Sequence, residues 1–292
     1  MRRKLFWFLI IVLVVFGFLA WLGSSDLDLL AGPNRIGVIE IRGSITNVRS
    51  QLNALKRFRK DPNVKAILVR VESPGGGIAA SQELYREIKR TKTEKPVLVS
   101  MGAIAASGGY YIAAPASRIF ANPGTITGSI GVISYFPNLR ELLQRIGVQT
   151  TIIKSGALKD VGNPGRDMTA EEKEYLQDTL DQAHRQFIRD IAEGRGMSEE
   201  AVRAVADGRI LMGETALNLG LVDELGNFED AVIAAAAMGG IEGEPQLIYA
   251  KKERRSLMDL LMGEDVSERV ASWIRGPEGY LHYELFWEGR PF

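Results

Sequence analysis

The sequence predicts an α/β fold built on a parallel sheet, preceded by one N-terminal transmembrane helix. Two observations lead to this prediction. From residue 36 onward, apolar β-rich segments alternate with amphipathic helical segments, which is the pattern of βαβ crossovers. Before them, residues 5–22 form an uncharged hydrophobic run that is long enough to cross a bilayer.

Composition excludes several kinds of site. Lysine plus arginine and aspartate plus glutamate balance at 36 each among 292 residues, so no global field attracts nucleic acid or another charged polymer. There is no cysteine, which excludes disulfides, thiolate zinc sites and cysteine nucleophiles. Only two histidines are present, so a histidine-based site has few candidates.

The N-terminus has the pattern of a membrane anchor. Three cations at residues 2–4 precede the run at 5–22, which as a helix spans about 27 Å. The cations predict a cytoplasmic N-terminus, with the rest of the chain outside the cytoplasmic membrane as a single-pass protein. A cleaved secretory signal is the alternative, but its apolar region is usually shorter, about 7–15 residues, and Trp21 and Leu22 are large for a cleavage site.

The remaining segments are expected in a simple order. We expect an anchor at 1–23, a linker at 24–34, a folded domain at 35–250 and a tail of open role at 251–292. Strands are expected at 36–43, 66–73, 96–102, 118–121, 125–134, 150–156 and 246–250; helices are expected at 48–60, 78–92, 138–146, 169–194, 198–208 and 228–240, with a short helix and a turn at 213–226.

Local signals support the helix boundaries. Asp61 and Pro62 end the first helix, because the residue before a proline disfavours helical geometry. Thr169 and Glu172 have the spacing of a capping box at the start of the long helix. Glycine closes the helix at 228–240.

The first motif is Ser-Pro-Gly-Gly-Gly at 73–77, between a buried strand and a helix. Three glycines let the backbone turn sharply and present bare N–H groups that can stabilise an anion. The motif lacks the Lys-Ser/Thr of a P-loop and the spacing of a dinucleotide fingerprint. An oxyanion site and a purely structural tight turn both remain open on this motif alone.

The second motif is Ala-Ala-Ser-Gly-Gly-Tyr-Tyr at 105–111, after the third strand. Small residues around Ser107 at a strand-to-helix transition would expose its hydroxyl and place the N–H of Gly108 beside the reacting centre. This is the logic of a nucleophile elbow without its G-x-S-x-G spacing. Close packing of a small-residue helix is the alternative explanation.

A nucleophilic serine needs a base. His184 lies in a charged helical stretch and His282 lies in the tail, so a Ser-His-Asp triad is not expected. A carboxylate or a lysine remains, and Ser–Lys pairs are a known variant of this chemistry. A lysine base must be neutral, so its pKa has to fall from about 10.4 through burial and hydrogen bonding. Lys159, after the segment 150–156, is the best candidate, although most lysines are simply solvated.

Four motifs in order, SPGGG, SMGAIAASGGYYIAA, TITGSIGV and IKSGALKD, together resemble the short form of signal peptide peptidase A. That is a membrane-anchored serine protease family with the Clp protease/crotonase fold of repeated β-β-α units. The resemblance covers about residues 36–226 and leaves the tail beyond about residue 251 uncovered.

The resemblance implies a role for each matching residue. Ser107 would be the nucleophile, Lys159 the general base, and Ser129 the residue that holds the lysine in place. The oxyanion hole would use the N–H groups of Gly108 and Gly76. The reaction would need no metal, nucleotide or other cofactor, and residues 35–250 would form the protease domain.

The resemblance also implies an assembly and a substrate class. In double-length relatives the lysine and the serine lie in different halves of one chain. A half-length chain is therefore expected to form a ring-shaped homo-oligomer in which Lys159 of one subunit reaches Ser107 of the next. The expected function is endopeptidase cleavage of residual signal peptides and similar apolar peptides at the outer face of the cytoplasmic membrane.

Two other functions are considered. A catalytically silent scaffold of the same fold could bind membrane peptides, but the intact Ser107 and Lys159 argue against it. An acyl-CoA enzyme of crotonase type would share the oxyanion turn, but such enzymes usually rely on carboxylates in the cytoplasm. Labelling by a serine-directed phosphonate and turnover of a CoA thioester separate these possibilities.

Overall fold

The computed structural model describes residues 34–250 and 282–284. The strands are β1 (Arg35–Arg42), β2 (Val64–Ser73), β3 (Gly75–Gly77), β4 (Val97–Ala105), β5 (Arg118–Ala121), β6 (Ile126–Gly128), β7 (Ile210–Met212), β8 (Glu224–Leu225), β9 (Gln246–Tyr249) and β10 (His282–Glu284). The helices are α2 (Arg49–Lys60), α3 (Ile78–Lys92), α4 (Gly108–Ala113), α5 (Arg140–Arg145), the 3-10 turn η2 (Ala157–Asp160), α6 (Ala170–Arg195), α7 (Glu199–Arg203), α8 (Gly213–Asn218) and α9 (Phe228–Met238).

The main sheet is mostly parallel, as the alternating sequence pattern predicts. Its strands follow the order β7-β6-β4-β2-β1-β9, and off this path β5 pairs with β4 and β8 pairs with β5. All of these pairs are parallel except β6 with β7. A second, two-stranded sheet pairs β3 with β10 in antiparallel register.

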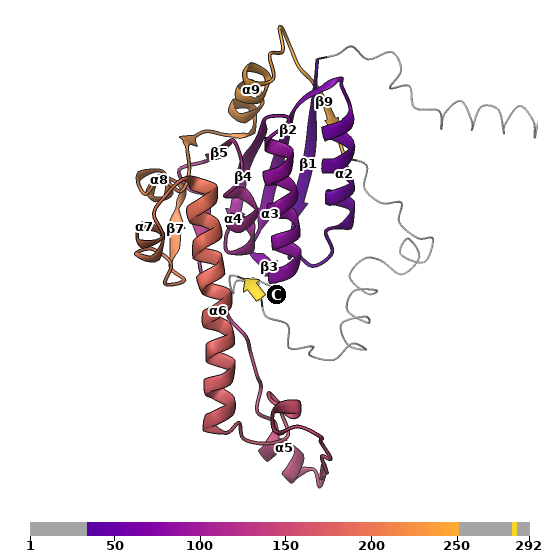
Figure 1. Ribbon diagram of the computed structural model, residues 1–292, viewed down its shortest axis with the longest axis vertical. Coiled ribbons are helices and arrows are strands. Elements are labelled where there is room, and N and C mark those ends of the chain that lie inside the picture. The colour runs from indigo at the N-terminus through magenta and orange to yellow at the C-terminus, as the bar shows by residue number, and fades with distance from the viewer. Residues whose placement is uncertain (1–33, 251–281, 285–292) are drawn as a thin grey trace, which may run out of the picture. The chain divides into compact units, whose positions relative to one another are not determined.

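Helices cover the main sheet on two faces (Figure 1). Along β2, Ile67, Val69 and Val71 belong to the larger core, which also includes side chains of α2, α3, α4 and α6. Ala66 and Leu68 alternate with them and pack with α9 on the opposite face. Both faces are buried, so residues 66–69 of β2 form a continuous apolar run instead of alternating between apolar and polar residues.

Helix α6 belongs to the core only near its C-terminal end. Phe187, Ile188 and Ile191 are fully buried in the larger core. The helix begins at a capping box in which Thr169 accepts from the backbone of Glu172 and the Glu172 side chain accepts in return. The predicted start of this helix is therefore confirmed in detail.

Residues 133–169, which we call the arm, precede α6 and lie at its N-terminal end, away from the main sheet (Figure 1). The arm includes α5 and η2. It folds back on itself, because the Leu139 N–H donates to the Pro164 carbonyl at 2.7 Å and Asn138 donates to Asp167 at 2.9 Å. Within the described chain, the hydrogen bonds and ion pairs recorded for residues 136–168 stay inside the arm or reach the first turn of α6.

Several predicted elements are wrong. No strand forms at 150–156, where Ile153 is 96% exposed and no neighbouring strand is available to pair with it. The strand expected at 125–134 is limited to β6, and the helix expected at 198–208 ends at Arg203. Four short strands, β3, β7, β8 and β10, were not predicted because each has only two or three residues.

The predicted anchor at 1–23 and most of the linker and tail lie outside the described residues. Among residues 34–250 and 282–284, no helix combines the length and hydrophobicity needed to cross a bilayer.

The two-faced core makes a prediction about stability. Leu68 is 0% exposed between the sheet and α9, so we expect Leu68→Ala to lower the free energy of unfolding by about 2–5 kcal/mol. Ile233, on α9 itself, is 68% exposed, so Ile233→Ala is expected to change it by less than about 0.5 kcal/mol. Urea unfolding of the two variants measures the difference, and equal stabilities would contradict the two-faced core.

Candidate active site

Ser107 lies at the turn between β4 and α4 in a strained conformation. Its backbone has φ 53° and ψ −116°, outside the regions that residues other than glycine usually adopt. The residue is 1% exposed, and its hydroxyl oxygen has no hydrogen-bond partner in the described chain. Backbone strain costs about 1–3 kcal/mol and an unsatisfied buried polar group costs a similar amount. A turn that keeps both is typical of a functional site.

Backbone hydrogen bonds hold this turn in place. The Ser107 N–H donates to the Gly128 carbonyl at 2.8 Å, and the Ala106 N–H donates to the Ser73 carbonyl at 3.1 Å. The second bond ties the turn directly to the start of the triple-glycine motif. The two motifs that the sequence singles out are therefore neighbours in the fold.

Gly76 and Gly108, the two predicted oxyanion donors, lie against each other. A Cβ atom added to Gly108 would lie 3.2 Å from the Gly76 nitrogen. Gly108 is the first residue of α4, so its N–H has no acceptor inside the helix. Gly76 has φ 153°, and a Cβ atom there would lie 2.4 Å from the Ile45 nitrogen. Only glycine at position 76 allows its backbone to lie this close to the backbone of Ile45.

Strand β3 has one edge paired inside the domain and one edge facing β10. The Gly75 carbonyl accepts from Ile45, and the Gly77 N–H donates to Ile45, both at 2.8 Å. Successive backbone groups of a strand point to opposite edges, so the polar groups of Gly76 belong to the other edge. There β10 pairs antiparallel with β3, with Tyr283 opposite Gly76. This edge beside Ser107 can therefore accept an extended chain.

Ser129 lies one residue beyond the carbonyl that holds Ser107. It also has a positive φ, 51°, is 7% exposed, and its N–H donates to the Arg209 carbonyl at 2.8 Å. The structure thus brings Ser107, Gly76 and Gly108 together, with Ser129 in the adjoining loop.

Lys159 is not brought to this site within one chain. It lies in η2 on the arm, with an exposed side chain, whereas Ser107 immediately precedes α4. In the described residues, no recorded hydrogen bond or ion pair joins it to Ser107 or Ser129. Within the described residues, the structure therefore brings the predicted nucleophile and the predicted oxyanion donors together, but not the predicted base.

Two features of the site region were missed by sequence reasoning. Ser81 is fully buried behind the oxyanion pair, where its hydroxyl donates to the Gly77 carbonyl at 3.0 Å. Asp160 and Arg166 on the arm and Glu172 in the first turn of α6 form a charged cluster next to Lys159. Only the capping-box role of Glu172 had a local sequence signal. In residues 34–250 no group of three acidic or histidine side chains has the arrangement of a metal site.

Comparison with known families identifies the chain's group. The model of peptidase family S49 matches residues 89–242, which include the turn at Ser107 and the arm. The chain belongs to peptidase family S49. This membership supports a serine peptidase as its class of enzyme.

Curated relatives agree with the S49 assignment. The chain is 41% identical over 262 residues to a putative protease of Synechocystis sp., covering 88% of this chain and 94% of the relative. It is 43% identical over 187 residues to a putative signal peptide peptidase SppA of Enterococcus faecium, covering 64% of this chain and 54% of that relative.

Among solved structures, the S49 chain resembles a mutant of ClpP1 from Listeria monocytogenes. The match has a TM-score of 0.45 at 20% sequence identity and covers 67% of this chain and 94% of the other.

The two neighbouring glycines of β3 give a matched test of the site. At Gly76 a methyl group would collide with the Ile45 backbone and displace the N–H, so we expect Gly76→Ala to lower peptidase kcat about 10²–10³-fold. At Gly77, where φ is −61° and the nearest atom to an added Cβ is 3.5 Å away, Gly77→Ala is expected to keep most of the activity. Peptide hydrolysis by both variants is the measurement, and equal activities would remove Gly76 from the oxyanion site.

Proposed function

We propose that this chain is a membrane-bound serine endopeptidase with a Ser–Lys dyad, in which Ser107 is the nucleophile and Lys159 the general base. The observation that carries the proposal is the buried, unbonded Ser107 hydroxyl on a strained turn beside the N–H groups of Gly76 and Gly108. A hydroxyl kept out of water and without a partner is available for a reacting group.

The proposed reaction follows from these positions. Neutral Lys159 takes the proton of Ser107, whose oxygen attacks the carbonyl carbon of a peptide. The N–H groups of Gly76 and Gly108 stabilise the oxyanion of the tetrahedral intermediate, and such a donor is worth about 10²–10³ in rate. Lys159 then protonates the leaving amine, and water repeats the sequence on the acyl-enzyme.

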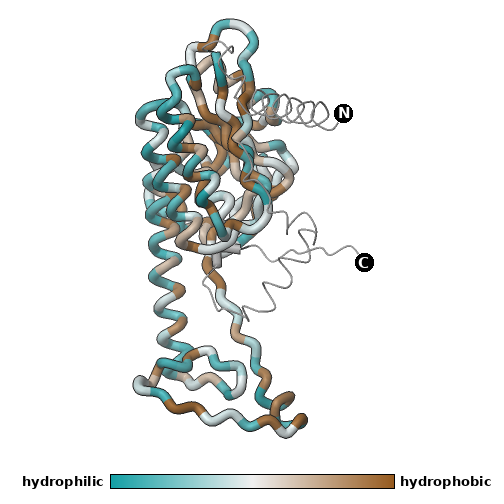
Figure 2. The backbone as a smooth tube through the Cα atoms, turned by 90° about the vertical axis from the view of Figure 1, so that its right-hand side faces the viewer, coloured by the Kyte–Doolittle hydropathy of each residue, from teal (hydrophilic) through white to brown (hydrophobic). Residues whose placement is uncertain are grey.

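The base in this proposal comes from a neighbouring subunit. Lys159 lies on an arm that is bonded to itself and to α6, while Ser107 is buried in the core of the domain. The arm also carries exposed hydrophobic stretches (brown in Figure 2), as an interface does. The exposed large hydrophobic residues of the arm are Ile133, Tyr135, Leu139, Leu142, Ile146, Val148, Ile152 and Ile153. A ring-shaped homo-oligomer would cover them and complete each site.

The proposed substrates are residual signal peptides and similar apolar peptides at the outer face of the cytoplasmic membrane. Three observations support this choice. The edge of β3 that pairs with β10 suits an extended peptide, which would add there as a strand in place of β10, with its carbonyl near Ser107. The hydrophobic run at 5–22 would anchor the enzyme beside such substrates. One relative is named a putative signal peptide peptidase.

Substitution of the dyad tests the chemistry. We expect Ser107→Ala and Lys159→Ala each to abolish casein and signal-peptide hydrolysis by the full chain in detergent, because each removes a group that no other residue replaces. Arg145→Ala, on the same arm and with a side chain that is 80% exposed, is the comparison for a general loss of positive charge. Full activity of Lys159→Ala would eliminate Lys159 as the base.

Mixing the two inactive chains tests the shared site. Co-expressed Ser107→Ala and Lys159→Ala chains should regain activity, because some interfaces then combine an intact Ser107 with an intact Lys159 from the neighbour. Activity is measured on purified mixed oligomers carrying one tag from each chain. If no mixture regains activity, the shared-site model fails.

A further inference from the structure

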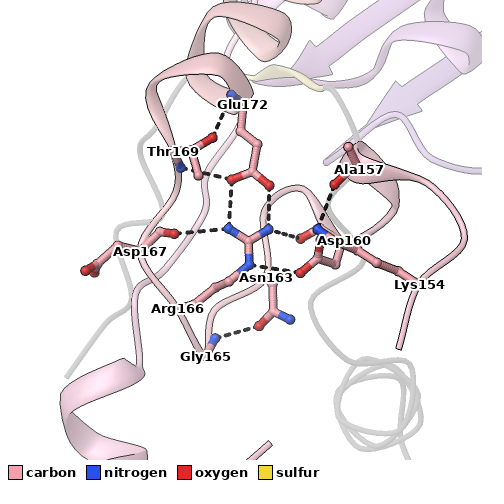
Figure 3. Close-up of polar contacts among 9 residues, drawn as sticks. All are labelled: Lys154, Ala157, Asp160, Asn163, Gly165, Arg166, Asp167, Thr169 and Glu172. Atoms are coloured by element: carbon pink, nitrogen blue, oxygen red, sulfur yellow. Dashed lines mark hydrogen bonds and ion pairs between the residues drawn. The ribbon is translucent and has the colours of Figure 1, made fainter. Parts of the chain in front are cut away.

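The residue that follows Lys159 belongs to a charged cluster on the arm. The Asp160 carboxylate is paired on one oxygen with the Lys154 ammonium and accepts from Arg166 Nε on the other at 2.9 Å (Figure 3). Arg166 also donates to the Asp160 carbonyl at 3.2 Å. The Asp160 side chain is only 11% exposed. The turn that carries Lys159 is therefore held at its C-terminal end by both the side chain and the backbone of Asp160.

The same guanidinium reaches the first turn of α6. Arg166 binds both carboxylate oxygens of Glu172, one of them at 2.8 Å (Figure 3). Glu172 is 4% exposed and also accepts from the Thr169 N–H at 2.9 Å in the capping box. Bidentate pairs of this kind are rigid as well as strong. Arg166 thus joins the turn at Lys159 to the helix that enters the core at Phe187.

Within the cluster, Asp160 pairs with Lys154 and Arg166 and not with the neighbouring Lys159. An aspartate next to a lysine in sequence could pair with it, and a nearby carboxylate favours the charged form of a lysine. Here each carboxylate oxygen of Asp160 already has a cationic partner, and no ion pair between Asp160 and Lys159 is recorded in the described residues. Two carboxylates and two cations balance within the cluster, which leaves Lys159 outside it.

The cluster keeps its charges at neutral pH. Hydrogen bonds from Arg166 and then Lys154 hold the pKa of Asp160 well below its usual range. The pKa of Glu172 is lowered to about 2, by Arg166 first and by the Thr169 N–H second. Both groups therefore remain ionised over the whole range in which a peptidase of this kind would work.

We propose that Arg166 is a positioning residue for the general base: it fixes the Lys159 turn to the first turn of α6 and keeps Asp160 from pairing with Lys159. This inference rests on the proposed function, because it acts through Lys159. A role in fastening the arm alone, without effect on Lys159, is the alternative that the experiment must exclude.

The first experiment compares Arg166→Gln with Arg140→Gln in the full chain, using a short apolar peptide amide as substrate. Arg140 is a matched control because it forms an exposed ion pair with Asp167 on the same arm. A base misplaced by about 1 Å can cost roughly 10²-fold in rate, so we expect kcat of Arg166→Gln to fall about 10²-fold. KM should stay within about twofold, since substrate binding is untouched. Arg140→Gln should keep both constants.

The second experiment asks on which side of the site Arg166 acts. Arg166→Gln chains are co-expressed with Ser107→Ala chains, which have an intact Arg166 and Lys159. Activity should be restored to the level of the Lys159→Ala and Ser107→Ala mixture, because both losses lie on the lysine side. A third variant, Glu172→Gln, should also lower kcat, and combining it with Arg166→Gln should add little because the two residues act as a unit.

The outcomes separate the two proposals. Unchanged kcat in Arg166→Gln, while Lys159→Ala is inactive, overturns the positioning role and leaves the dyad intact. The positioning role is also overturned if co-expressed Ser107→Ala chains restore the activity of Lys159→Ala but not that of Arg166→Gln. Arg166 would then not act through Lys159. Activity in Lys159→Ala defeats the proposed function itself. Circular dichroism and oligomer size identify a variant whose arm is unfolded. A loss of kcat that is explained by such unfolding supports the alternative, in which Arg166 only fastens the arm.

Discussion

The close approach of two backbones, at Gly76 and Gly108, is the constraint on which the site depends. A strand-to-helix turn can present a serine only if the chain beside it leaves room for the substrate carbonyl. Parallel pairing of β2 with β4 brings the two turns to the same edge of the sheet, and the Ala106 to Ser73 hydrogen bond joins them. The absence of side chains at both glycines then lets two N–H groups lie side by side. The strained Ser107 is stable because this framework holds it.

The core around this framework has a simple origin in the sequence. The central strands have apolar side chains on both faces, and helices cover both faces of the sheet. Because the strands lie between two layers, the turns at their carboxyl ends are held firmly. The fold therefore supports Ser107, the proposed nucleophile, on rigid strands and carries Lys159, the proposed base, on a separate element.

Sequence reasoning worked where the signal was local. The alternation of apolar segments predicted the parallel sheet, and the capping box at Thr169 predicted the start of α6. The segment 150–156 was predicted wrongly because β-branched residues favour a strand only where a neighbouring strand is available, and Ile153 has none. The cluster of Asp160, Arg166 and Glu172 could not be predicted. Its members are six residues apart, which in a strand would separate them by about 20 Å and in a helix would place them on different faces. An irregular turn brings them together instead.

Helix α6 has one further consequence through its length. Its 26 residues extend about 39 Å, and only the end near Phe187 is gripped by the core. By simple geometry, a tilt of about 5° about the C-terminal end, which packs in the core, would displace the N-terminal end by roughly 3 Å. Reaction rates respond to displacements of about 1 Å. Contacts at the N-terminal end of α6 must therefore limit the tilt of the helix.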